Sequence, residues 1–230
     1  MTEETRAGAQ GRWKAPVTPK RAVAFERDPE VMRTYGVKAG WAPWSLRFWR
    51  GLAIGFCIFS IIGHWVEIPY CLFNDWAFGI VDDDSLVFAD PMYPFCVYGI
   101  ASVLCALLLV PQRDWLIYRY QPKWRAVLRF WLFAVLASMI GELSMGLLLN
   151  QPDPVTGVYP LWDNSYLPFN VLQQAWLVND VLLGTLVTLY IWVLYPLLVK
   201  SLSSVPERWG WPITIAVVVS FIILCVVKFS

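Results

Sequence analysis

Charged side chains are scarce in this sequence. Asp, Glu, Lys and Arg make up 15% of its 230 residues, whereas about one quarter is usual for a soluble domain. Hydrophobic residues reach 58%, and a soluble chain of this length has too little volume to bury that much apolar surface. The scarcity of charge therefore excludes a soluble enzyme and a disordered chain. It indicates a polytopic membrane protein, and the 14 Trp and 10 Tyr fit this class because these residues gather where a bilayer meets water.

Motifs for nucleotide binding and covalent catalysis are missing as well. The sequence contains no Gly-x4-Gly-Lys-Ser/Thr phosphate loop, so it has no ATP site of the kind that drives an ABC transporter. The single histidine, His64, has no Ser or Cys nucleophile at a recognisable spacing. A net charge of +1 gives no reason to expect a nucleic-acid partner. We therefore expect no enzymatic activity, no cofactor and no bound nucleic acid.

The five cysteines do not have the spacing of a metal site. Most of them fall in apolar stretches, where cysteine commonly serves as a small packing residue. Two, Cys71 and Cys96, are expected near the outer face of the membrane, and the sequence leaves open whether they form a disulfide. We predict no metal site among these residues: Cys57, Cys71, Cys96, Cys105 and Cys225.

Five stretches are long and apolar enough to cross a bilayer, for which a helix needs about 20 mostly apolar residues. The hydropathy pattern predicts an all-α transmembrane bundle over residues 46–230. Residues 1–45 are polar and basic, and we expect a largely disordered cytoplasmic tail there. The predicted spans are residues 52–69, 92–110, 127–149, 172–199 and 211–227.

Lys and Arg are distributed unevenly among the predicted loops. Ten of the 18 lie in residues 1–50, five in residues 113–129 and two in residues 200–208, whereas residues 70–91 and 150–171 contain none. Basic residues are retained on the cytoplasmic side of a membrane. The pattern predicts a multi-pass protein of the plasma membrane with a cytoplasmic N-terminus and an outer C-terminus.

Four ionisable residues fall within the predicted spans, where a charge is costly and commonly marks a functional site. At about 1.5 Å of rise per residue, they come from three helices at a similar depth in the outer half of the membrane. They are therefore predicted to line one polar cavity that binds a cation, protons or a polar solute. The alternative is that they pair with one another and hold the bundle together. These residues are His64, Glu67, Glu142 and Asp180.

Residues 162–170 read Trp-Asp-Asn-Ser-Tyr-Leu-Pro-Phe-Asn. This segment resembles the Trp-Asp-Tyr-Ser-x-x-Pro-Phe-Asn motif of the CmpB-like family of ABC-transporter type IV, permease-like membrane proteins. Residues 63–67 are similar to the family's Gly-Trp-x-x-Glu, and residues 90–99 to its Gly-Pro-x-x-Pro-Ile-Tyr-Gly with a longer spacing. The resemblance extends over about residues 55–200. The matching positions are Glu67, Pro94, Tyr98, Gly99, Trp162, Asp163, Pro168 and Asn170.

The chain departs from the family pattern after Asn170. The family's Gly-Arg is replaced by Gln173-Gln174, and a small polar position becomes Asp180. If the family's Arg offsets membrane carboxylates, the resemblance implies that Glu142 and Asp180 lack their usual partner in this chain. The motif before the fourth span has two interpretations, an interfacial entry in which Asn170 caps the helix or a lid over the polar cavity.

The resemblance implies a permease-like membrane component of a transporter for an unidentified solute. Its partners would be the lipid bilayer and either a separate ATPase subunit or a second copy of the chain. The competing interpretation is a non-transporting membrane scaffold, sensor or assembly factor.

Overall fold

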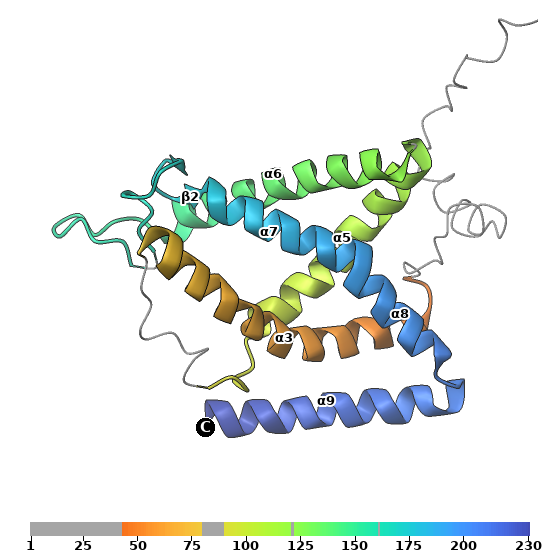
Figure 1. Ribbon diagram of the computed structural model, residues 1–230. Helices are drawn as coiled ribbons and strands as arrows, with labels where there is room; N and C mark the ends of the chain where they lie inside the picture. The colour runs from red at the N-terminus through yellow and green to blue at the C-terminus, as the bar shows by residue number, and fades with distance from the viewer. Residues whose placement is uncertain (1–42, 80–89, 121, 161) are drawn as a thin grey trace, which may run out of the picture.

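The computed structural model describes residues 43–79, 90–120, 122–160 and 162–230 (Figure 1). Most of the predicted cytoplasmic tail therefore lies outside the described residues. Within them, five helices are long and apolar enough to cross a membrane, and the predicted all-α bundle is confirmed. They are α3 (Leu46–Phe78), α5 (Cys96–Arg119), α6 (Lys123–Leu149), a fourth helix over Leu177–Ser204, and α9 (Glu207–Phe229).

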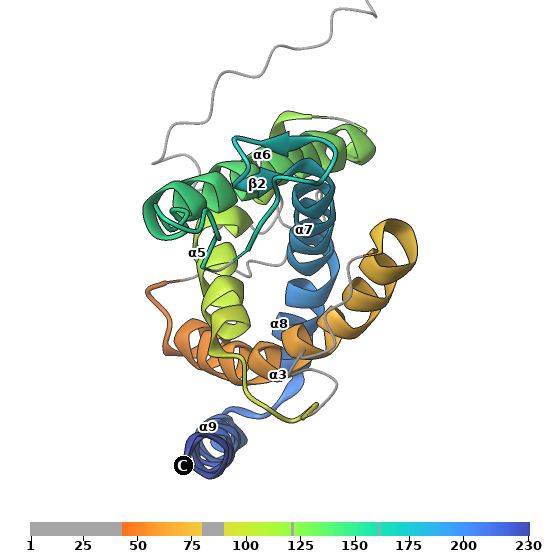
Figure 2. The same ribbon diagram turned by 90° about the vertical axis from the view of Figure 1, so that its left-hand side faces the viewer.

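Successive helices run in opposite directions, so that α3 begins at one end of the bundle and α9 ends at the other (Figure 1). Viewed at a right angle, α9 lies apart from α5, α6 and α7 and beside α3 (Figure 2). Large apolar side chains are exposed along its length, among them Ile215, Ile222 and Val226. A helix with so little buried surface suits a lipid environment better than water.

Two helices begin later than the spans predicted for them, and other helix ends lie several residues outside the predicted spans. The second helix begins at Cys96 rather than at residue 92, because Pro91 and Met92 form a turn that is closed by the Tyr93 N–H donating to the Asp90 carbonyl. The fourth helix begins at Leu177 rather than at residue 172, because the preceding residues form a small β-hairpin. Neither segment contains a charged residue, and both adjoin long apolar runs, so hydropathy alone did not separate them from the helices.

The fourth helix is built from α7 (Leu177–Leu189), a π-helical turn η2 (Tyr190–Leu194) and α8 (Tyr195–Ser204). Hydrogen bonds to α5 stabilise this wide turn. Arg113 of α5 donates through Nη1 to the Ile191 carbonyl at 2.9 Å. The Tyr190 hydroxyl donates in return to the Ser102 carbonyl at 3.0 Å. Buried apolar side chains surround this turn, including the fully buried Val110 and Phe130.

Glycines set the closest helix approaches. A Cβ added at Gly99 of α5 would overlap the Ser60 hydroxyl of α3 and lie 2.7 Å from the Phe56 carbonyl oxygen. A Cβ added at Gly184 of α7 would lie 2.7 Å from the backbone nitrogen of Val135 in α6. Contact at this range requires a residue without a side chain. These two crossings place the ionisable residues of α3, α6 and α7 at one end of the bundle.

We expect Gly99→Ala to destabilise the bundle by about 1–3 kcal/mol, because overpacking forces the two helices apart. Thermal unfolding of the purified protein in detergent measures this loss. Gly141→Ala is the matched control, since a Cβ at Gly141 has no neighbour within 4 Å. Equal unfolding temperatures for the two variants would contradict the assignment of Gly99 to the crossing.

Candidate functional site

His64 and Glu67 lie on one face of α3, and the structure brings them together. The imidazole is fully buried, with Nδ1 3.1 Å from Glu67 Oε2 and Nε2 3.2 Å from the Asp90 carbonyl oxygen. The Tyr98 hydroxyl donates to the other oxygen of Glu67, and the Phe95 ring stacks on the imidazole with centroids 4.7 Å apart. Both ring nitrogens therefore face acceptors, and the ring donates to one as imidazole and to both as imidazolium.

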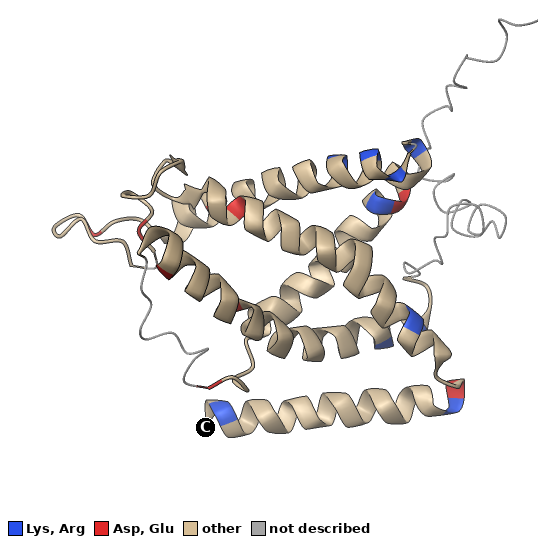
Figure 3. Cartoon of the chain, in the orientation of Figure 1, with Lys and Arg blue, Asp and Glu red and all other residues tan. Residues whose placement is uncertain are grey.

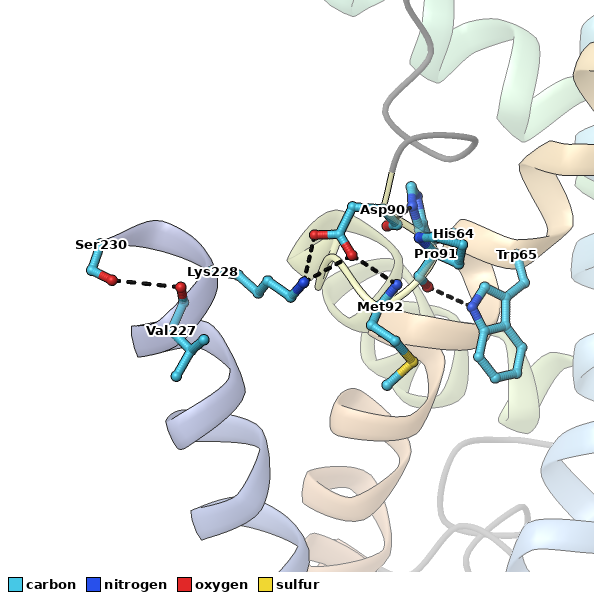
Figure 4. A network of polar contacts seen from close by, with 8 residues as sticks. All are labelled: His64, Trp65, Asp90, Pro91, Met92, Val227, Lys228 and Ser230. Atoms are coloured by element: carbon cyan, nitrogen blue, oxygen red, sulfur yellow. Dashed lines mark hydrogen bonds and ion pairs between the residues drawn. The ribbon is translucent and has the colours of Figure 1, made fainter.

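Asp90 connects His64 to the last helix (Figure 4). Its carboxylate accepts from Lys228 Nζ of α9 at 2.9 and 2.7 Å, and from the Met92 N–H at 3.3 Å. The hydrogen bond from Lys228 holds the pKa of Asp90 below its ordinary value. At the other end of α9, Glu207 accepts from Arg47 and Arg50 of α3, each at 2.5 Å. Polar contacts thus fix α9 at both ends.

Glu142 of α6 and Asp180 of α7 form a second group, which we call the carboxyl pair. Asp180 is 0% exposed, and no donor among the described residues reaches either of its carboxylate oxygens. Glu142 is its electrostatic and hydrogen-bonding neighbour. Two ionised carboxylates have acceptors only, so a hydrogen bond between them requires a proton on one. The backbone N–H of Trp176 approaches Glu142 Oε2 at 3.4 Å.

Tyr70 of α3 lies between the two groups and is a site residue that sequence reasoning missed. Its hydroxyl donates at 3.0 Å to Oδ1 of Asn179, the residue before Asp180. Its side chain is within electrostatic reach of both Glu142 and Glu67. A tyrosine near the end of a span is ordinarily assigned to the interfacial belt, so only the packing of α3 identifies this position.

The α6–α7 loop, described over residues 150–160 and 162–176, contains a β-hairpin next to Glu142. Its strands β1 (Asn170–Val171) and β2 (Ala175–Trp176) pair antiparallel. The turn uses left-handed backbone at Leu172 and Gln173, with φ of 52° and 63°. Trp176 closes the hairpin because its indole N–H donates to the Pro168 carbonyl at 2.9 Å.

Gln174 is the centre of the loop. It is buried and exchanges hydrogen bonds with the fully buried Asn150, through its Oε1 and its Nε2, each at 3.1 Å. Its backbone carbonyl accepts from the Trp162 indole at 2.8 Å and from the Asn164 amide at 3.0 Å. Gly146 makes room for this side chain, because a Cβ there would lie 2.6 Å from Gln174 Cβ. The residue that replaces the family's Arg thus holds the loop against α6.

The motif positions of the loop build this hairpin and do not cap a helix. Asn170 accepts from the Gln173 N–H and donates to the Leu167 carbonyl, whereas α7 begins after Trp176 without a side-chain cap. The prediction that Asn170 caps the fourth helix is therefore wrong. Asp163 accepts from the Ser165 side chain and N–H, which lower its pKa.

A family model with the description "Putative ABC-transporter type IV" matches residues 54–229. The chain belongs to this CmpB family. The match includes α9, which the resemblance over residues 55–200 did not reach. No curated protein and no solved structure matches the chain.

The CmpB-family motifs fall on contacts described above. Tyr98 donates to Glu67, Gly99 allows α5 to approach α3, and Pro94 is fully buried beside them. Trp162 and Pro168 hold the hairpin that places Trp176 beside Glu142. Two distant motifs therefore serve the two groups of ionisable residues.

None of the five cysteines of this CmpB-family protein forms a disulfide, and Cys71 is not bridged to Cys96. Cys96 is instead a neighbour of Cys225 in α9. Among the residues that the structure describes, no group of three or more His, Cys, Asp or Glu side chains is arranged to hold a metal ion.

We expect Gln174→Ala to destabilise the loop of this CmpB-family protein by about 1–3 kcal/mol, because the buried Asn150 loses its two hydrogen bonds to the Gln174 side chain. Limited proteolysis between Asn150 and Trp176 measures the opening of the loop. Gln151→Ala is the matched control, since Gln151 is exposed and its side chain donates to the Leu147 carbonyl one turn back on α6. Equal cleavage rates for the two variants would contradict the central role of Gln174.

Proposed function

We propose that this CmpB-family protein is the membrane subunit of a transporter for a polar solute or ion in the plasma membrane. Asp180 carries the proposal, because it is a fully buried carboxyl without a donor among the described residues. A membrane protein retains such a costly group chiefly where a substrate, ion or proton passes. The proposed solute site comprises the carboxyl pair together with His64 and Glu67. Tyr70 lies between these two groups and connects them.

Energy would come from another subunit. The chain has no phosphate loop, so an ATPase of this transporter is a separate protein that docks on the cytoplasmic side. The basic end of the bundle, formed by the end of α5 and the start of α6, is the surface for this contact. It carries exposed Lys123 and Arg125 beside Trp124.

The proposed orientation follows from the charges. Most Lys and Arg residues of the described chain lie at the end of the bundle where α3 begins and α8 ends (Figure 3). Acidic residues lie mainly toward the other end, where Lys228 is bound to Asp90. With the basic end in the cytoplasm, the α6–α7 loop and the C-terminus face outward.

Reporter fusions test this orientation. Alkaline phosphatase fused after Ser230 is expected to be active, because the enzyme matures only outside the cytoplasm. The same enzyme inserted after Arg119, between α5 and α6, is expected to be inactive. A fluorescent cytoplasmic reporter that works after Ser230 would contradict the five-span orientation.

We expect Glu142→Gln and Asp180→Asn to abolish transport while the protein still reaches the membrane, since each replaces a carboxyl by an amide of the same shape. Cells that lack the chain are complemented with each variant, and small solutes in cells and medium are compared by mass spectrometry. A solute whose distribution depends on the wild-type chain should lose that dependence by about tenfold or more.

Asp153→Asn is the matched control, because Asp153 lies in the exposed part of the loop and its carboxylate contacts only its own turn. Membrane abundance is measured for every variant. Normal solute distribution in all variants, or loss of abundance alone in Glu142→Gln and Asp180→Asn, would contradict transport and favour a scaffold.

A further inference from the structure

We propose that Glu142 and Asp180 form a proton-binding site, in which one proton shared between the two carboxyl groups takes the place of a cationic partner. Proton binding is argued from the surroundings of the two carboxyl groups and does not require transport. Only a role of the proton as the coupling ion rests on the proposed function. The ligand is thus the smallest cation, bound between α6 and α7.

The first step is the burial of Asp180. Its side chain is fully enclosed by protein, and neither oxygen has a donor among the described residues. An isolated carboxylate in such surroundings loses its hydration without compensation, and the group takes up a proton instead of remaining charged. Elsewhere in the described residues, buried Asp114 has a guanidinium partner, Arg113 Nη2, at 2.7 Å. Asp180 has no equivalent.

The second step is the identity of the neighbours. α6 contributes Glu142, a like charge, and β2 contributes only the backbone N–H of Trp176. α3 contributes Tyr70, whose hydroxyl is donated to Asn179 and whose ring is within reach of Glu142. None of the ion pairs formed among the described residues includes Glu142 or Asp180. Two adjacent carboxylates without a cation cannot both stay ionised, so they hold one proton in common.

A metal ion fits the same position poorly. Ca²⁺ takes about six to eight oxygen ligands and Mg²⁺ requires a near-octahedral shell. Across the described segments, no third His, Cys, Asp or Glu joins the pair in a metal-binding arrangement. A shared proton needs only one oxygen from each of the neighbouring carboxyl groups, Glu142 and Asp180.

The hairpin responds to the state of this site. The Trp176 N–H lies 3.4 Å from Glu142 Oε2, and a hydrogen bond to an ionised carboxylate is shorter and about twice as strong as one to a neutral acid. Release of the shared proton therefore strengthens the attachment of the hairpin to α6. Uptake of the proton weakens it, so the hairpin lies on the path between the site and the aqueous side of the loop.

Carbodiimide labelling of the full chain in detergent tests the proposal. A carbodiimide adds to a protonated carboxyl in an apolar site, with transfer of the acid proton to a carbodiimide nitrogen and formation of a stable acylurea. We expect peptide mass spectrometry to find the adduct on Glu142 or Asp180. Above the midpoint of its titration, labelling should fall by about tenfold per pH unit.

Two variants and one control make the test specific to the pair. Glu142→Gln and Asp180→Asn each remove the like charge and supply an amide donor, so the pH of half-labelling at the remaining carboxyl should fall by about one unit or more. Asp153→Asn should leave the profile unchanged. Asp153 itself should stay unlabelled, because hydrogen bonds from Thr156 and Val155 hold the pKa of this exposed carboxyl below its ordinary value.

Three results would overturn the proposal. They are absence of an adduct on both residues between pH 6 and 9, an unchanged midpoint in both variants, and protection from labelling by sodium or calcium ions at constant pH, which would identify a metal cation as the ligand. The labelling requires no transport. An adduct with the expected pH profile in a chain that moves no solute would refute the proposed function and retain the proton site.

Discussion

The lack of water inside a bilayer forces each polar group of a membrane helix to find its partner within the protein. Several polar side chains of this bundle satisfy that condition across a helix interface. Trp131 of α6 donates to the Thr185 hydroxyl of α7 at 2.9 Å, and Tyr98 of α5 donates to Glu67 of α3. Asp180 stands out because its surroundings offer an acceptor where a donor is needed. The Gly184 crossing, one turn further along α7, and the hairpin beside Glu142 both hold this part of α7 against α6.

Hydropathy and charge were sufficient to predict the helices, because a span leaves a long apolar signal that few other structures produce. The ends were harder to place, since residues 172–176 are uncharged and continue the apolar run while their backbone turns back. Gln173 has a positive φ at the position where the family pattern has glycine, the residue that adopts such backbone without steric cost. That mismatch was the one available signal of a tight turn.

The four ionisable residues selected from the sequence all lie on the described helices, but their grouping into two pairs needed the structure. The i, i+3 spacing of His64 and Glu67 already places both on one face. Depth along separate helices gave no information on which neighbour each carboxyl faces. Tyr70 and Asn150 escaped notice because each is an ordinary residue type for its position, and only tertiary contacts distinguish them. Gln174 was noticed only as a departure from the family pattern, and its hydrogen bonds to Asn150 needed the structure.

The π-helical turn has a consequence for the faces of the fourth helix. A turn of this kind accommodates one additional residue, and each residue advances an α-helix by about 100°. The stripe that carries Asp180 and Gly184 along α7 therefore does not continue down α8. At the turn and just beyond it, the interior is occupied by Phe130, Ile191 and Tyr195, all of them buried. The fourth helix therefore has two registers: before the turn its buried positions are Asp180 and Gly184, and after the turn its buried position is Tyr195.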